Sequence, residues 1–305
     1  MERIGPYEVI GRIGRGGSAD VLLAMTKDGA RCVIKRLHDH LAANEGFVRM
    51  FLDEARVMSL LPHPSIVRVF DLGEDGASCY TAMELVDGPN LAAVNKLLRA
   101  PMPPDVIIPI GAAVAEALAF VHAAFDPTSG DPLDLVHRDV AAPNILVSRD
   151  GDVKLIDFGV VRSQRARSLG IISSEPTRSG VIKGRRSTMS PEQVLGHAVD
   201  ARADLFSLGV VLWESLAGKK LWTADGALEL VDAIVRSEAP PVPRRDIAPA
   251  LASLIASMLE KDPDARPQTA VEVATKLRDM GPGERTSKKT IGELIRSLDV
   301  PSLVP

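Results

Sequence analysis

The chain has 305 residues, of which 46% are hydrophobic, and its formal net charge is −4 at pH 7. This length and composition can bury a large core, and the net charge excludes a general attraction to nucleic acid or to anionic membranes. Two cysteines, Cys32 and Cys79, are too few for a disulfide framework or a zinc cluster, so a reducing cytoplasm is the expected location.

Near the N-terminus, two apolar runs at residues 7–10 and 21–25 predict β-strands joined as a hairpin. Between them lie Gly14, Gly16 and Gly17. Glycine lets the backbone approach an anion closely and adopt dihedral angles that a Cβ atom would forbid. The hairpin is therefore a candidate for covering phosphate groups, although turns of this composition are common in proteins of other functions.

A further predicted strand ends at Lys35, and a helix is predicted over residues 47–61. At helical spacing, one face of this helix carries Phe47, Phe51, Glu54, Met58 and Leu61. A carboxylate on an apolar face must find a partner, and a helix packed on the preceding sheet would direct Glu54 at Lys35. The alternative is a surface glutamate at the margin of the helix.

Residues 106–125 are apolar enough to form either a core helix or a membrane span, because only Glu116 and His122 in this window are ionisable. We predict a core helix, with no membrane span, because the larger apolar side chains form one stripe and Glu116 lies nearly opposite it. The predicted stripe consists of Val114, Leu118, Val121 and Phe125.

Two acidic side chains and one amide follow farther along the chain, at Asp139, Asn144 and Asp157. Between the last two lie short apolar runs, residues 145–147 and 153–156, separated by a turn, which predict a β-hairpin. Such a hairpin would hold Asn144 and Asp157 near one point. Their oxygen atoms suit Mg²⁺, which prefers hard oxygen ligands and completes its shell with water and substrate phosphates.

In order and spacing, these motifs resemble those of the protein kinase family over about residues 7–280. The resemblance implies an α+β, two-lobed fold. Its small lobe, residues 1–86, would hold an antiparallel β-sheet and one main helix, and its large lobe, residues 87–281, would be mainly helical. Residues 282–305 would form a linker and a short helix, which we expect to be loosely ordered.

The resemblance also implies ATP and Mg²⁺ as cofactors and proteins as substrates. Lys35, paired with Glu54, would position the phosphates, Asn144 and Asp157 would hold the metal, and Asp139 would orient the accepting hydroxyl. Met83 would be the gatekeeper beside the adenine. The residues implied to contact the nucleotide are Ile13, Gly14, Gly16, Gly17, Val21, Val33, Lys35, Met83, Glu84, Val86 and Leu146.

Other matched positions would act as scaffolding rather than as reacting groups. Glu192 would pair with Arg266, and Asp204, on a helix expected over residues 201–217, would brace the catalytic loop. His137 would be structural, and Phe158 would pack under the helix that carries Glu54.

Several positions depart from the family pattern, and each leaves an alternative open. They are Ala19 for the third glycine, Ala141 for a lysine, Arg185 for a threonine and Thr188 for a tyrosine. Serine/threonine specificity is the first hypothesis and tyrosine specificity the second. A pseudokinase or slow kinase that acts as a nucleotide-binding scaffold is the alternative function.

The candidate activation segment, residues 160–189, is rich in arginine and in hydroxyl groups. The hydroxyls are Ser168, Ser173, Ser174, Thr177, Ser179 and Ser187. A phosphate there could pair with Arg138 and order the segment, which makes self-association for autophosphorylation a hypothesis. The alternative is an unmodified loop that its charges keep soluble.

Overall fold

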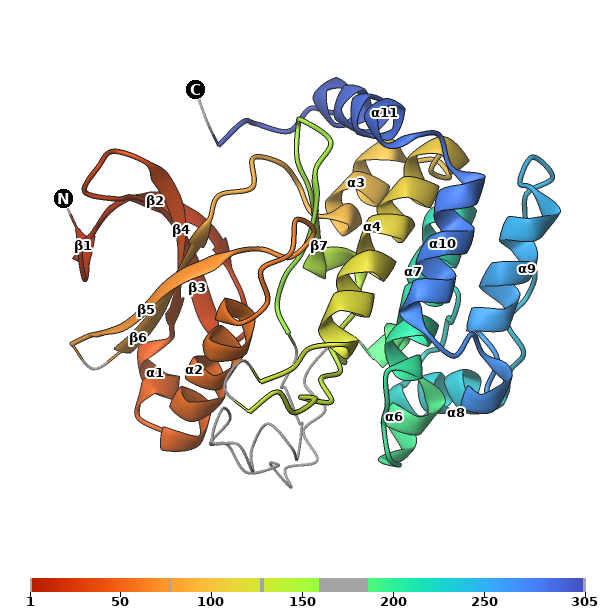
Figure 1. The fold of residues 1–305 in the computed structure, drawn as a ribbon, viewed down its shortest axis with the longest axis horizontal. Helices are drawn as coiled ribbons and strands as arrows, with labels where there is room; N and C mark the ends of the chain where they lie inside the picture. Colours follow the sequence, from red (N-terminus) through yellow and green to blue (C-terminus); the bar gives the residue numbers. More distant parts are fainter. Residues whose placement is uncertain (1, 77, 127–128, 159–185, 304–305) are drawn as a thin grey trace.

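The structure, a computed structural model, describes residues 2–76, 78–126, 129–158 and 186–303. Its N-terminal part is a six-stranded antiparallel sheet in the order β1-β2-β3-β4-β6-β5, with two helices beside it (Figure 1). The strands are β1 (Arg3–Ile4), β2 (Tyr7–Arg15), β3 (Ala19–Met25), β4 (Arg31–Leu37), β5 (Val69–Asp75) and β6 (Ser78–Glu84). The helices are α1 (Asp39–Ala42) and α2 (Glu45–Ser59).

Helix α2 matches the predicted main helix of this lobe, with one correction to its buried face. Asn44 caps the helix by accepting a hydrogen bond from the Gly46 N–H, which satisfies one of its unpaired donors. Phe51, Met58 and Leu61 are buried as predicted, but Phe47 is 42% exposed. The prediction for Phe47 was wrong because Val48 and Leu52 pack against the cluster around Phe51 instead.

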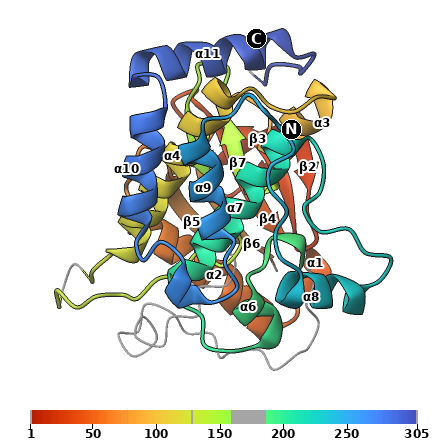
Figure 2. The same cartoon turned by 90° about the vertical axis from the view of Figure 1, so that its right-hand side faces the viewer.

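The rest of the chain is mainly helical, as expected for a two-lobed fold (Figure 2). Its helices are α3 (Leu91–Leu98), α4 (Pro104–His122), α6 (Pro191–Leu195), α7 (Arg202–Ala217), α8 (Ala227–Arg236), α9 (Pro249–Met258), α10 (Ala270–Met280) and α11 (Glu284–Ser297). Its 3₁₀ turns are η1 (Ala142–Asn144), η2 (Arg186–Thr188) and η3 (Pro263–Ala265), and its strands are β7 (Ile145–Val147) and β8 (Val153–Leu155). The predicted lobe boundary falls between β6 and α3, and it stays a prediction.

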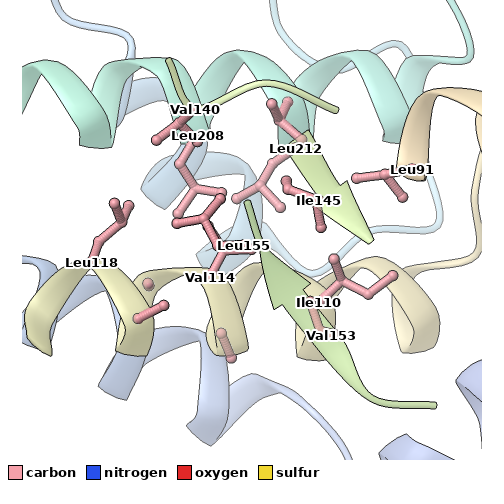
Figure 3. Close-up of a cluster of buried hydrophobic side chains, with 14 of the residues drawn as sticks. Leu91, Ile110, Val114, Leu118, Val140, Ile145, Val153, Leu155, Leu208 and Leu212 are labelled. Carbon is pink, nitrogen blue, oxygen red and sulfur yellow. The ribbon is translucent and has the colours of Figure 1, made fainter. Parts of the chain in front are cut away.

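The hairpin β7–β8 is anchored in the largest hydrophobic core, between α4 and α7 (Figure 3). Ile145 and Leu155 pair across the two strands and are fully buried. Side chains from both helices meet them, among them Val114 from α4 and Leu208 from α7. Burial on this scale stabilises each large aliphatic side chain by about 1.5–3 kcal/mol, so the hairpin has a rigid support.

Helix α4 is a core helix in this structure. Val114, Leu118 and Val121 are fully buried as predicted, whereas Phe125 is 59% exposed because α4 ends at His122, before it. Glu116 forms an ion pair with Arg278 on α10. Among the described residues, α4 is the one helix with the length and hydropathy of a membrane span, and 61% of its apolar window is buried inside the fold.

The expectation of a loosely ordered tail is wrong for residues 284–297, which form α11. Ile291 and Ile295, one helical turn apart, are almost completely buried, and α11 packs on α4. The apolar spacing of these residues with Leu294 is the signal of an amphipathic helix that the sequence contains.

Candidate active site

The side chains of Lys35, Glu54 and Asp157 meet at one point, although they come from β4, α2 and the segment after β8. The Lys35 Nζ atom lies 2.9 Å from Glu54 Oε1 and 2.7 Å from Asp157 Oδ1. Strand β4 lies inside the sheet between β3 and β6, which fixes the base of Lys35. The predicted pairing of Glu54 with Lys35 is therefore confirmed, and the surface alternative for Glu54 is not.

The electrostatics of this cluster hold the lysine in its charged form. Burial alone would lower the pKa of Lys35, but the carboxylates of Glu54 and Asp157 outweigh it and raise that pKa above its usual range. Burial raises the pKa of Glu54, and the Lys35 ammonium opposes this effect. The cluster lines a cavity together with Met83, Thr81 and Met58, among other residues. The Lys35 ammonium therefore stays charged in the cavity, beside two carboxylates that offset its charge.

Asn144 and Asp139 form a second polar group. The Asn144 Nδ2 atom donates to the Asp139 carboxylate at 2.8 Å and to the Asp139 carbonyl at 2.9 Å. The Ile156 N–H donates to the Asn144 carbonyl at 2.9 Å. This bond holds the backbone just before Asp157 against the backbone of Asn144. Asn144 thus contacts Asp139 through its side chain and the segment before Asp157 through its backbone, and the predicted meeting of the Asn144 and Asp157 side chains stays a prediction.

Asp204 holds the segment before Asp139 in an uncommon backbone conformation. Its carboxylate is fully buried and accepts hydrogen bonds from the N–H groups of His137 and Arg138, both at 2.8 Å. Arg138 has a φ of 66°, a left-handed conformation that costs free energy for a residue with a side chain. The two hydrogen bonds to Asp204 offset that cost. The geometry therefore agrees with the predicted role of Asp204 in bracing this segment.

The charge of Asp204 is maintained despite its burial. Burial would raise the pKa of Asp204, but hydrogen bonds from His122 and from the Arg138 N–H hold that pKa below its usual range. His122 lies 2.8 Å from the carboxylate and was not assigned a role from the sequence. An ionisable residue in the last turn of an otherwise apolar core helix is the signal that could have found it.

A buried ion pair fixes the segment after the candidate activation segment. Arg266 donates to both carboxylate oxygens of Glu192, at 2.8 and 2.9 Å, as predicted. Gln193, the next residue, caps α6 together with Ser190 and also donates to the Arg138 carbonyl at 3.0 Å. Gln193 was missed, although Ser190 with a glutamine three positions later is a capping-box signature.

Of the candidate nucleotide-contacting residues, Lys35 and Met83 line this cavity, and the contacts of the others with a nucleotide stay predictions. Ile13 and Gly14 lie in β2, Gly16 and Gly17 in the turn that follows, and Val21 in β3 opposite Gly14. Val33 in β4 pairs with Met83 in β6, Glu84 ends β6, Val86 is buried and Leu146 lies in β7. Met83 lines the cavity beside Lys35, whereas the Glu84 side chain pairs with Lys154 instead.

The candidate activation segment falls mostly outside the described residues. Arg185 and the hydroxyls Ser168, Ser173, Ser174, Thr177 and Ser179 all lie there, so the hypothesis of phosphorylation stays a prediction. Ser187 and Thr188 are described, and Thr188 is buried within η2.

The protein kinase domain model matches residues 7–277 of this chain, which is most of its length. The chain belongs to the protein kinase family. Family membership accounts for the two-lobed fold and for the conjunction of Lys35, Glu54 and Asp157 between the lobes. It also agrees with the resemblance on which the site residues were chosen.

Curated kinases of bacteria are similar to this chain. They include the tyrosine-protein kinase MasK of Myxococcus xanthus, 33% identical over 92% of this chain and 43% of that protein. The serine/threonine-protein kinase pkn2 of Myxococcus xanthus is 34% identical over 90% of this chain and 32% of that protein. PknB of Mycolicibacterium smegmatis is 35% identical over 89% of this chain and 42% of that protein. The chain thus spans less than half the length of these relatives.

Protein kinases generally use ATP and Mg²⁺, and the donor chemistry of this chain fits that metal. Asp157 offers a carboxylate and Asn144 an amide oxygen, both hard ligands of the kind Mg²⁺ prefers. Because the Asn144 amide nitrogen donates to Asp139, its oxygen is directed away from that carboxylate. Two protein ligands leave the remaining positions of an octahedral shell to water and phosphate oxygens.

Proposed function

We propose that this chain is an ATP-dependent protein kinase that transfers the γ-phosphoryl group of Mg-ATP to serine and threonine hydroxyls of proteins in bacterial signalling. The observation that carries the proposal is the meeting of Lys35, Glu54 and Asp157 at one point beside Asn144 and Asp139. The presence of all five side chains counts against a protein that only binds nucleotide as a scaffold, because phosphoryl transfer needs these groups most.

Each residue of the site has a distinct task in this proposal. Lys35, held in position by Glu54, would contact the phosphates, while the backbone of residues 14–17 covers them. Asn144 and Asp157 would hold the magnesium ion, which supplies positive charge for the phosphate oxygens when bound. Asp139, fixed by Asn144, would orient the substrate hydroxyl. The catalytic effect is positioning and electrostatic stabilisation, since the transition state is loose and negatively charged.

One assay tests the proposal directly. Purified protein with labelled ATP, magnesium and a generic basic protein substrate should transfer label to the substrate. Asp139→Asn should abolish the transfer without abolishing nucleotide binding, because it removes the group that orients the hydroxyl. Equal transfer by both proteins would assign the signal to a contaminating kinase and contradict the proposal.

Tyrosine transfer is the second candidate for the same chemistry. Ala141 stands where serine/threonine kinases usually have a lysine, and tyrosine kinases often have alanine there. One of the similar proteins is named a tyrosine-protein kinase and two are named serine/threonine-protein kinases. Phosphoamino-acid analysis of labelled substrate distinguishes the two, and a product that contains phosphotyrosine alone would overturn the first choice.

The proposed setting follows from the same residues. Cys32 and Cys79 are free and buried, which agrees with a reducing cytoplasm, and the expected partners are ATP and protein substrates. Self-association for autophosphorylation belongs to this proposal. The intact mass after incubation with Mg-ATP shows whether the protein gains phosphate. An active enzyme that never gains phosphate in residues 160–189 would contradict autophosphorylation there.

A further inference from the structure

The last helix of the chain is fixed firmly to the large lobe. Ile291 and Ile295 insert into its core, and Ser287 is buried at the start of the helix. The helix also docks on the β7–β8 turn, where Lys288 pairs with Asp152 at 3.0 Å. The approach is close: Gly151 has a φ of 87°, and a Cβ atom there would overlap the Lys288 carbonyl oxygen. The end of α11 therefore has a defined position.

After α11, residues 298–303, which we name the C-terminal strap, run back toward the small lobe (Figure 1). The Arg149 guanidinium donates to the carbonyl of Val300 in the strap. The Asp87 carboxylate accepts hydrogen bonds from the Ser302 hydroxyl and from the Leu303 N–H, both at 2.7 Å. Asp87 directly follows Val86, the last residue of the predicted small lobe, so the strap crosses the connection between the lobes, which we call the hinge.

The strap ends on the small lobe itself. The Arg31 guanidinium donates to the Leu303 carbonyl at 2.8 Å. Arg31 is the first residue of β4, the strand that carries Lys35, and its neighbour Cys32 pairs with Glu84 at the end of β6. One short segment thus joins α11, the hinge and the strand of the phosphate-binding lysine.

We propose that the C-terminal strap tethers the two lobes and so positions Lys35 relative to Asn144 and Asp157 for nucleotide binding. The inference rests on the proposed function for its nucleotide. A two-lobed protein with a hinge samples open and closed states, and a bridge that is present only when the lobes are close favours the closed state. Arg31 and Asp87 are positioning residues in this scheme, because they act through the strap and not on the phosphates.

The test compares the full chain with a strapless variant that ends at Ser297 and therefore keeps α11. Spin labels at Lys27→Cys and Thr275→Cys, exposed residues of the two lobes, report lobe separation without any nucleotide. The strapless variant should give a broader distribution of distances. Its affinity for a non-hydrolysable ATP analogue with magnesium should fall about five-fold, since the hydrogen bond between the strap and Arg31 on the small lobe is lost.

Point variants separate the tether from a general loss of structure. Arg31→Gln shortens the side chain and removes its charge, so it should reproduce part of both effects, whereas Arg31→Lys keeps a long, charged donor and should restore the affinity and the narrow distribution. Arg49→Gln is the matched control, because Arg49 is another small-lobe arginine whose ion pair with Glu45 is exposed. Full chain and control should give the same distances and affinity.

Two outcomes would overturn the tether. One is an unchanged distance distribution in the strapless variant, and the other is a broader distribution with unchanged affinity for the analogue. A chain that binds no nucleotide in any form would contradict the proposed function. The distance measurement would still decide in that case whether the strap joins the lobes.

Discussion

The charged side chains of this protein fall into two groups that differ in their access to water. In the cleft, the side chains of Lys35, Glu54 and Asp157 are 16%, 21% and 41% exposed. Elsewhere, Asp204, which accepts hydrogen bonds from the N–H groups of His137 and Arg138, is completely buried, and the Arg266 side chain is fully buried in its pair with Glu192. Both groups are paired, but only the first can exchange its partners for a ligand.

This difference in exposure predicts which substitutions mainly affect activity and which mainly affect stability. A cleft charge whose partner is removed can still reach water or a bound ligand, so its loss should mainly affect activity. A fully buried charge whose partner is removed cannot reach water, so the free energy of its desolvation destabilises the folded state. The predictions below test this separation, and the first concerns the buried pair.

Arg266→Gln should lower the free energy of unfolding by about 3–5 kcal/mol, because it leaves the Glu192 carboxylate buried with a weaker partner. Denaturant-induced unfolding measures the change. The control is Arg236→Gln, which removes an ion pair to Asp232 whose side chains are 79% and 63% exposed. An exposed pair contributes less than about 1 kcal/mol, so equal unfolding midpoints for the two variants would contradict the separation.

Lys35→Met should act on the opposite side of the comparison. We expect transfer of phosphate to fall by about 100-fold or more, because a preorganised positive charge is removed from the phosphate site. Its cost in unfolding free energy should be smaller than that of Arg266→Gln, since Glu54 and Asp157 are both partly exposed. Activity assays and denaturant unfolding on the same preparation test this. A variant that loses more unfolding free energy than Arg266→Gln but keeps most of its phosphate transfer would contradict it.

The sequence predicted two ion pairs that join separate elements of the fold, and it misplaced two phenylalanine side chains. Lys35 with Glu54 and Glu192 with Arg266 were expected, because a charge in an apolar environment requires a partner and the family motifs supply it. Phe47 and Phe125 were assigned to buried faces, but helical spacing does not determine where a helix ends or which neighbour covers it.

A short helix was expected in the C-terminal segment, but its firm packing on the large lobe was missed for a different reason. Its helix is amphipathic, yet its hydrophobic surface is small and its many charged residues are typical of a loose tail. Only the large lobe provides the groove in which Ile291 and Ile295 are buried. Likewise, the hydrogen bonds of Asp87 with Ser302 and Leu303 join residues that no sequence pattern relates.

A mild decrease in pH should weaken the folded state through His137, which is buried, and His63, which is partly buried. Burial lowers the pKa of His137, outweighing the nearby carboxylates of Asp204 and Asp139, and burial also lowers the pKa of His63. The folded chain keeps both rings neutral while the unfolded chain takes up protons below about pH 6.5. Stability should therefore fall with decreasing pH below that value, by up to about 1.4 kcal/mol per pH unit for the fully buried His137 and by less for the partly exposed His63.

Thermal unfolding between about pH 7.5 and about pH 5.5 measures this slope. His137→Phe should make the slope shallower, because it removes the titrating group and keeps a ring 4.5 Å from that of Phe158. His197→Gln alters an exposed histidine and serves as the control. A slope that His137→Phe leaves unchanged would show that other groups dominate the acid sensitivity.

The smallest expected effect comes from adding a charge to the cleft. Ala141 lies at the start of η1, two residues after Asp139, and it is almost completely buried. In Ala141→Lys the stem would lie along the loop and the ammonium would reach the transferring phosphate, so turnover should rise about three-fold. Ala141→Met adds a stem of similar volume without the charge, and should therefore share any cost of overpacking but not the gain. Equal turnover in the lysine and methionine variants would mean that positive charge at this position does not limit the rate, and that the cleft already supplies enough through Lys35 and the metal.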